Sequence, residues 1–184
     1  MSRPVPSPAP FLELLAAAGP PPAGPNADLY DALLGDWDAE VVDHLPDGSG
    51  RRQSAEMHFA RVLAGRAIQD LWIVPAVREQ EAPSPTAAEG LRYGTTLRVY
   101  DAKLGAWRIT WWNPVSGVEA RLVGRRVGSR IVQTGADPDG ALVRWCFDEV
   151  GPASFHWVGE RSLDGGETWR RETEFFARRR RAGA

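Results

Sequence analysis

The sequence predicts an all-β protein, an antiparallel up-and-down barrel of about eight to ten strands. Short runs of β-branched and aromatic residues recur along the chain, and Gly, Asp and Asn separate them without helical patterns in between. Closing such a meander into a barrel leaves no sheet edge exposed. The expected strands cover residues 37–44, 53–60, 66–74, 92–101, 106–113, 117–124, 129–134, 141–148, 153–162 and 167–177.

Residues 1–26 are rich in Pro and Ala, and we expect them to form an arm ahead of the barrel. A short N-terminal helix is expected at Phe11–Ala18, because Pro20-Pro21-Pro22 cannot continue a helix. Prolines rather than a basic region precede this stretch, and it contains Glu13. We therefore interpret it as a helix or arm and not as a signal peptide.

The barrel domain is expected to span residues 27–178. At its start, Asn26 or Asp28 is expected to cap a short helix that runs to about Leu34. A second Pro/Ala-rich segment, residues 81–89, is expected to be an exposed loop.

The chain ends in a basic segment, residues 179–184, which continues a run of arginines from Arg178 to Arg181. We interpret it as a solvated tail, because no second basic cluster or aromatic platform accompanies it. The formal net charge of −2 also gives no general attraction to polyanions. No nucleic-acid partner is therefore predicted.

Missing residue types exclude several common chemistries. Cys146 is the only cysteine, which excludes an internal disulfide and thiolate-rich metal sites. Lys103 is the only lysine and lies in a turn-like segment, so a Schiff-base lysine is not expected. No run approaches the ~20 apolar residues of a membrane span. No membrane association is predicted, and a cytoplasmic location is expected by default.

Leu34-Gly35-Asp36-Trp37 opens the first expected strand with a G-x-W pattern. It resembles the G-x-W of lipocalins and related barrels, in which the Trp plugs the closed end. Further segments follow in order: Val62–Arg66, Tyr100–Asp101, Gly105–Trp107, Val143–Trp145 and Ser162–Trp169. Together they resemble a bacterial family of calycin-like (lipocalin-like) β-barrels of unknown function, over about residues 30–178. The resemblance implies a barrel with a cavity and supplies no catalytic residues.

The segment Ser162–Trp169 also matches the S-x-D-x-G-x-T-W pattern called an Asp-box, familiar from sialidase propellers. A single copy cannot build a propeller. We interpret it as a structural turn, in which the Asp164 carboxylate accepts hydrogen bonds and Trp169 packs beneath the hairpin.

The sequence holds eight Trp residues, and strand alternation places several of them on common faces. They are predicted to line a ligand pocket or to fill the interior of the barrel, and the resemblance favours the pocket slightly. The predicted pocket residues are Trp72, Trp107, Trp111, Trp145 and Trp157. Arg171 and Thr173 are the predicted polar anchor, because they share a strand face with Phe175.

Three side chains are candidates for proton transfer: Asp70, Glu56 and His156. Asp70 lies in an apolar strand, where desolvation or pairing with Arg171 or Arg144 is expected to shift its pKa. A structural ion pair is the favoured interpretation of Asp70 over catalysis.

The histidines predict no metal site, because no two have the local spacing of metal ligands. Alternation places His58 and His156 outside the barrel, opposite apolar neighbours. No cofactor is predicted. Haem stays an alternative, because nitrobindins, small barrels of this broad type, bind it through one histidine.

The leading hypothesis is a binding protein that holds a small hydrophobic or aromatic molecule, anionic ones included, inside the barrel. The alternative is a small-metabolite enzyme, an isomerase, cyclase or hydrolase, that uses the cavity as a reaction chamber. The ligand and the formation of a homodimer are left open by the sequence.

Overall fold

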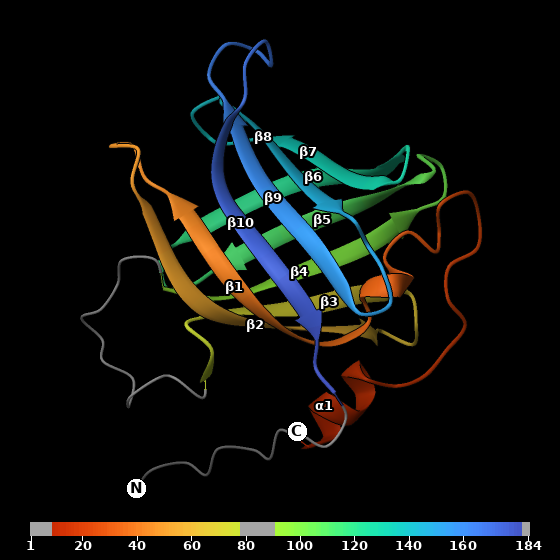
Figure 1. Ribbon diagram of the computed structural model, residues 1–184. Coiled ribbons are helices and arrows are strands. Elements are labelled where there is room, and N and C mark those ends of the chain that lie inside the picture. Colours follow the sequence, from red (N-terminus) through yellow and green to blue (C-terminus); the bar gives the residue numbers. More distant parts are fainter. Residues whose placement is uncertain (1–8, 78–90, 182–184) are drawn as a thin grey trace, which may run out of the picture.

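The computed structural model describes residues 9–77 and 91–181, and these form a closed antiparallel barrel of ten strands (Figure 1). The strands are β1 Gly35–His44, β2 Gly50–Val62, β3 Ala67–Val74, β4 Arg92–Asp101, β5 Ala106–Asn113, β6 Val118–Val127, β7 Arg130–Ala136, β8 Leu142–Asp148, β9 Ser154–Ser162 and β10 Arg170–Arg179. Consecutive strands pair with one another, and β10 pairs with β1 to close the barrel. The predicted up-and-down barrel is confirmed.

Each predicted strand is present, with bounds that differ by a few residues. The clearest differences are at β2, which begins at Gly50 instead of residue 53, and at β10, which begins at Arg170 instead of residue 167. Both strands flank tight turns, whose residues carry too little apolar periodicity to define a strand end.

The turn between β9 and β10 explains the late start of β10. The Asp164 carboxylate accepts hydrogen bonds from the Thr168 backbone N–H at 2.9 Å and from the Ser162 hydroxyl at 2.7 Å. The Trp169 indole N–H donates to the Gly166 carbonyl at 3.1 Å. These are the contacts of a structural turn, as the single Asp-box predicts.

The short N-terminal helix is also confirmed: α1 spans Ala9–Leu15 and lies outside the barrel (Figure 1). The Leu15 carbonyl accepts a hydrogen bond from the Leu63 backbone N–H at 2.9 Å, which attaches the predicted arm to the β2–β3 turn. Within the described residues, no helix is long and apolar enough to cross a membrane. The expected loop at residues 81–89 lies outside the described part of the chain.

A 3₁₀ helix, η1 (Asp31–Leu33), replaces the second expected helix. Tyr30 occupies its N-cap position without a side-chain capping bond, so neither Asn26 nor Asp28 has the predicted capping role. Packing explains the difference, because the Tyr30 ring is fully buried and its hydroxyl donates to Gln133 at 3.2 Å.

Trp37 and η1 close one end of the barrel, as the G-x-W resemblance implies. The Trp37 ring is fully buried, and its indole N–H donates to the Leu33 carbonyl at 2.7 Å. The Phe155 ring lies edge-on at a centroid distance of 4.7 Å. A buried Trp whose N–H is satisfied combines a large apolar contribution with no unpaired donor.

Arg179 and Arg180 do not belong to the solvated tail expected for residues 179–184, because β10 continues through Arg179 and Arg180 pairs with carboxylates of the barrel. Residues 182–184 lie outside the described part of the chain. The Arg179 guanidinium lies 4.1 Å from the Trp37 ring centroid and donates to the Leu34 carbonyl at 2.7 Å. Arg180 pairs with carboxylates of β1 and β2 at 2.7 and 2.8 Å. Arg179 therefore covers the Trp37 plug at the closed end, and Arg180 attaches the end of the chain to β1 and β2.

We expect Trp37→Ala to lower the free energy of unfolding by about 3–5 kcal/mol, because it leaves a cavity at the closed end. The matched control is Trp112→Ala, whose side chain is 47% exposed on the outer face and whose loss is expected to cost about 1 kcal/mol or less. Urea unfolding followed by circular dichroism measures both. Equal losses would contradict the role of Trp37 as a plug.

Candidate functional site

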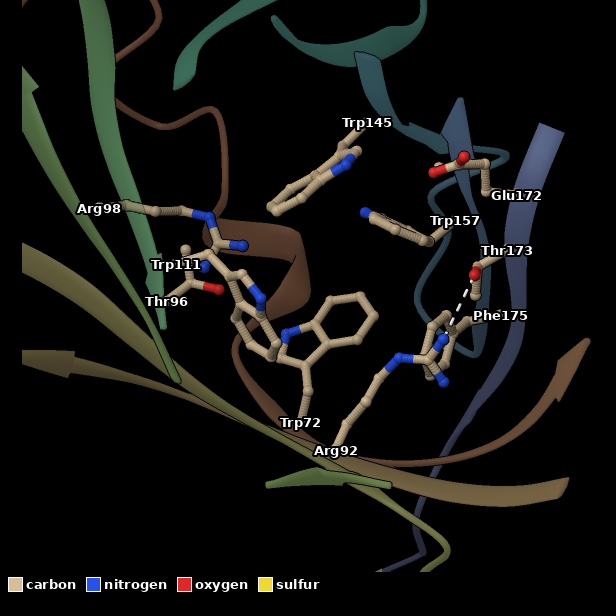
Figure 2. Close-up of a pocket in the computed structure, with 11 residues that line it drawn as sticks. Trp72, Arg92, Thr96, Arg98, Trp111, Trp145, Trp157, Glu172, Thr173 and Phe175 are labelled. Carbon is tan, nitrogen blue, oxygen red and sulfur yellow. Dashed lines mark hydrogen bonds between the residues drawn. The ribbon is translucent and has the colours of Figure 1, made fainter. Parts of the chain in front are cut away.

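The barrel holds a cavity of about 180 Å³, whose lining residues are shown in Figure 2. It lies toward the end at which β4 begins, opposite the end at which η1 precedes β1. Its lining comes from β3, β4, β5, β8, β9 and β10 and consists of Trp72, Arg92, Thr96, Arg98, Trp111, Trp145, Trp157, Gly159, Glu172, Thr173 and Phe175. Arg92 and Thr173 lie at its mouth, where β4 and β10 begin. The interior is therefore neither solid nor fully hollow.

Five aromatic rings form the apolar part of the cavity. The Trp72 ring centroid lies 4.7 Å from that of Phe175 and 5.2 Å from that of Trp157, and both pairs meet edge-to-face. Trp145 lies 5.8 Å from Trp157 and 6.5 Å from Trp111. Because the rings are steeply inclined to one another, the cavity presents both ring faces and ring edges to an occupant.

Two strand glycines make room for these rings. A Cβ at Gly94 would collide with the Trp111 ring, and a Cβ at Gly159 would lie 2.7 Å from the Trp157 ring. Both positions point inward, since Gly94 pairs with Trp72 and Gly159 pairs with Thr173. The absent side chains let large rings lie against the neighbouring backbone.

An ion pair is buried on the β3–β5 side of the cavity. Asp70 and Arg98 are 1% and 2% exposed and pair directly. Asp70 also accepts a hydrogen bond from the Thr96 backbone N–H at 2.8 Å, and the Arg98 guanidinium lies 4.9 Å from the Tyr30 ring centroid. Two charges are tolerated inside an apolar barrel because each has the other as partner. Arg98 lines the cavity, whereas Asp70 lies behind it.

The mouth of the cavity is organised around Asp43, which is 5% exposed. Its carboxylate accepts hydrogen bonds from Arg51 at 3.0 Å, from the Thr173 hydroxyl at 2.9 Å, and from Arg92. Burial opposes the ionisation of Asp43, but the bonds from Arg92, Arg51 and Thr173 outweigh it and hold the pKa below its ordinary value. A single carboxylate thus positions two guanidinium groups.

A β-bulge in β10 decides which of its polar residues reach the cavity. The register shifts between Arg171, which pairs with Glu160, and Thr173, which pairs with the inward Gly159. The extra residue reverses the alternation, so Arg171 points outward, where its side chain is 51% exposed and pairs with Glu174 at 3.0 Å. The expectation that Arg171 shares the inner face with Thr173 is corrected by this bulge.

Of the predicted pocket residues, Trp72, Trp111, Trp145, Trp157 and Thr173 line the cavity. Trp107 does not. It lies at the closed end, where its indole N–H donates to the Asn26 carbonyl at 2.9 Å and its ring lies 5.3 Å from Tyr30. Alternation placed Trp107 correctly inside the barrel but gave no depth along the barrel axis.

The predicted proton-transfer candidates do not converge. Glu56 lies on the outer face, where it pairs with Arg180 at 2.8 Å. His156 also lies outside, stacked on Phe176 at 4.6 Å. Asp70 is inside, but its partner is Arg98 rather than Arg171 or Arg144. The three side chains therefore share no site.

Six lining residues were not predicted as members of the pocket: Arg92, Thr96, Arg98, Gly159, Glu172 and Phe175. Arg98 could have been found by alternation, because it lies two residues after Thr96 and four after Gly94 and therefore shares their inward face of β4. Arg92 and Glu172 carried no such signal, since one begins a strand and the other occupies the bulge.

A closed antiparallel barrel that is plugged at one end and hollow at the other is a calycin-like, or lipocalin-like, barrel. Rv2717c from M. tuberculosis has a similar structure, with a TM-score of 0.58, 15% sequence identity, and coverage of 87% of this chain and 100% of that one. The S-type phycobiliprotein lyase CPES from Guillardia theta is also similar, with a TM-score of 0.54, 9% identity, and coverage of 84% and 92%. No family model and no curated protein sequence matches the chain.

The described residues contain no group of three or more His, Cys, Asp or Glu side chains arranged to hold a metal ion. His44 and His156 each place their Nε2 atom against the same Glu174 carboxylate, at 2.7 and 2.9 Å. This arrangement lies on the outer face of the barrel, away from the cavity.

We expect Asp43→Asn to lower the free energy of unfolding by about 2 kcal/mol at neutral pH, because it removes charge-assisted hydrogen bonds at the mouth. The lowered pKa of Asp43 means that this stabilisation is full above the ordinary value of 3.8 and is lost as the pH falls through the lower folded-state value. The difference between the protein and the variant should therefore shrink on acidification.

Urea unfolding at several values from about pH 7 to about pH 3 measures this difference. Glu40→Gln is the control, because Glu40 forms an ion pair with Arg52 on the exposed outer face of the barrel. A difference for Asp43→Asn that stays constant with pH would contradict the assignment.

Proposed function

We propose that the barrel binds a small aromatic or hydrophobic anion, with its ring among the Trp side chains and its anionic group at Arg92. One observation carries the proposal. The cavity is aromatic, and at its mouth two arginines pair with the single carboxylate of Asp43, which leaves one positive charge in excess. Sites for small molecules are usually lined by many apolar side chains and a few polar groups.

The size of the cavity limits the ligand. An apolar cavity of ~150 Å³ holds one benzene ring. The cavity of about 180 Å³ therefore suits one ring with short substituents, rather than a lipid or a large macrocycle. A longer ligand would have to extend through the mouth into solvent.

The charges at the mouth favour an anion. Asp43 accepts from both Arg51 and Arg92, so the cluster carries one more positive than negative charge. Arg92 lines the cavity and also donates to the Thr173 hydroxyl at 3.3 Å, which fixes the direction of its guanidinium. Glu172 also lines the mouth, but it pairs with Arg170 at 2.6 Å. A ligand carboxylate at Arg92 would form charge-assisted hydrogen bonds in a partly desolvated site.

The similar structures support a ligand-binding barrel in general terms, and one of them belongs to a phycobiliprotein lyase. For this chain, binding is better supported than catalysis. Glu56 and His156 face away from the cavity, and Asp70 is already committed to Arg98. An enzyme of the isomerase, cyclase or hydrolase kind needs a free proton-transfer group at the ligand.

We expect 4-isopropylbenzoate to bind about tenfold or more tightly than 4-isopropylbenzamide, because only the acid carries a charge for Arg92. Isothermal titration calorimetry of both compounds measures the ratio. Arg92→Gln should reduce the ratio to about one, whereas the exposed outer-face control Arg121→Gln should preserve it. Failure of both compounds to bind at millimolar concentration would contradict the proposal.

A further inference from the structure

Two buried nitrogen atoms beside the cavity lack hydrogen-bond acceptors. The indole Nε1 of Trp72 and the guanidinium Nε of Arg98 have no partner in the described chain. Both side chains line the cavity and are at most 5% exposed. A buried donor without an acceptor is destabilising, so unpaired donors beside a binding cavity indicate a ligand oxygen that would satisfy them.

These donors lie on the same side of the cavity. Trp72 is on β3, Arg98 is on β4, and the neighbouring Thr96 pairs in register with Trp111 of β5. Figure 2 shows the Arg98 guanidinium, the Thr96 oxygen and the indole nitrogen atoms of Trp72 and Trp111 gathered on this side. We call it the donor wall. The opposite side is formed by the rings of Trp145 and Trp157, whose indole nitrogen atoms are not among the buried donors that lack a partner.

We infer that the donor wall recognises an oxygen acceptor on the ligand, at a position distinct from the anionic group held by Arg92. This inference rests on the proposed function and makes it more specific. The ligand class is an aromatic carboxylate that carries a second oxygen acceptor, such as a carbonyl, across the ring from the carboxylate.

The charge arrangement favours a neutral acceptor at the donor wall. Arg98 is already neutralised by Asp70, so the wall offers N–H groups but no net charge. A carbonyl oxygen accepts hydrogen bonds without adding a charge, whereas a second carboxylate would be buried beside Asp70. A ligand without this oxygen would leave these donors unpaired, and we therefore expect it to bind much more weakly.

The two recognition groups lie within reach of one small ligand. The Arg92 guanidinium is 5.8 Å from the Phe175 ring centroid, and the Trp72 ring is 4.7 Å from the same centroid. Both therefore lie against the same lining side chain, so the charged mouth and the donor wall are adjacent parts of one cavity. A cavity of about 180 Å³ has room for one ring with a short substituent on either side.

The test compares 4-acetylbenzoate with 4-isopropylbenzoate by isothermal titration calorimetry. The two differ mainly in a carbonyl oxygen that replaces a methyl group, so shape and carboxylate stay almost constant. We expect 4-acetylbenzoate to bind about tenfold or more tightly. Equal binding overturns the donor wall while the proposed function stands, and absence of binding by both compounds overturns the two together.

Trp72→Phe removes the indole N–H and keeps an aromatic ring at this position, so it tests the hydrogen-bond donor. The variant is expected to lose most of the preference for the acetyl compound, because the ratio of the two affinities reports the N–H group while both compounds occupy the same altered cavity. Trp112→Phe is the control, because it removes an indole N–H from the outer face of the barrel, where Trp112 is 47% exposed, and should keep the preference. A preference that survives Trp72→Phe, or one that Trp112→Phe abolishes, overturns the assignment to the donor wall.

Discussion

The pairing of β10 with β1 is the interaction on which the rest of the structure depends. It runs from Trp37 opposite Arg179 to Asp43 opposite Thr173, and it turns a ten-strand meander into a barrel without a free edge. One end of this pairing brings Arg179 onto the Trp37 plug. The other end brings Asp43 to the Thr173 hydroxyl and forms the mouth of the cavity. A single register therefore closes one end of the barrel and organises the other.

Buried charge is the second constraint on the interior. Asp70 and Arg98 are both inside the barrel, and removing either one would leave the other uncompensated, which is much more costly than losing an exposed pair. At the mouth, Asp43 satisfies Arg51 and Arg92 together. The polar groups that face the cavity are thus held in fixed directions before any ligand binds, which lowers the entropic cost of binding.

The strands and the aromatic interior could be predicted because each depends on local periodicity. Alternation placed Trp111, Trp145 and Trp157 on aromatic strand faces, and these three line the cavity together with the predicted Trp72. The error at Arg171 has a definite origin, because one inserted residue at a bulge reverses the two faces and leaves no mark in the sequence pattern. Trp107 was assigned to the wrong end, since alternation specifies the face of a strand and not the depth along the barrel.

The sequence by itself determined the all-β class, the order of the strands, the short N-terminal helix and the aromatic interior, because these follow from propensities and spacings along one strand at a time. Only the tertiary structure decided which charges meet. Arg98 reaches Asp70 from 28 positions away, and Arg92 reaches Asp43 from 49 positions away. Such pairs depend on the register between strands and on closure of the barrel, and side-chain chemistry gives no preference among the many arginines of this chain. The location of the cavity depends on the same long-range geometry.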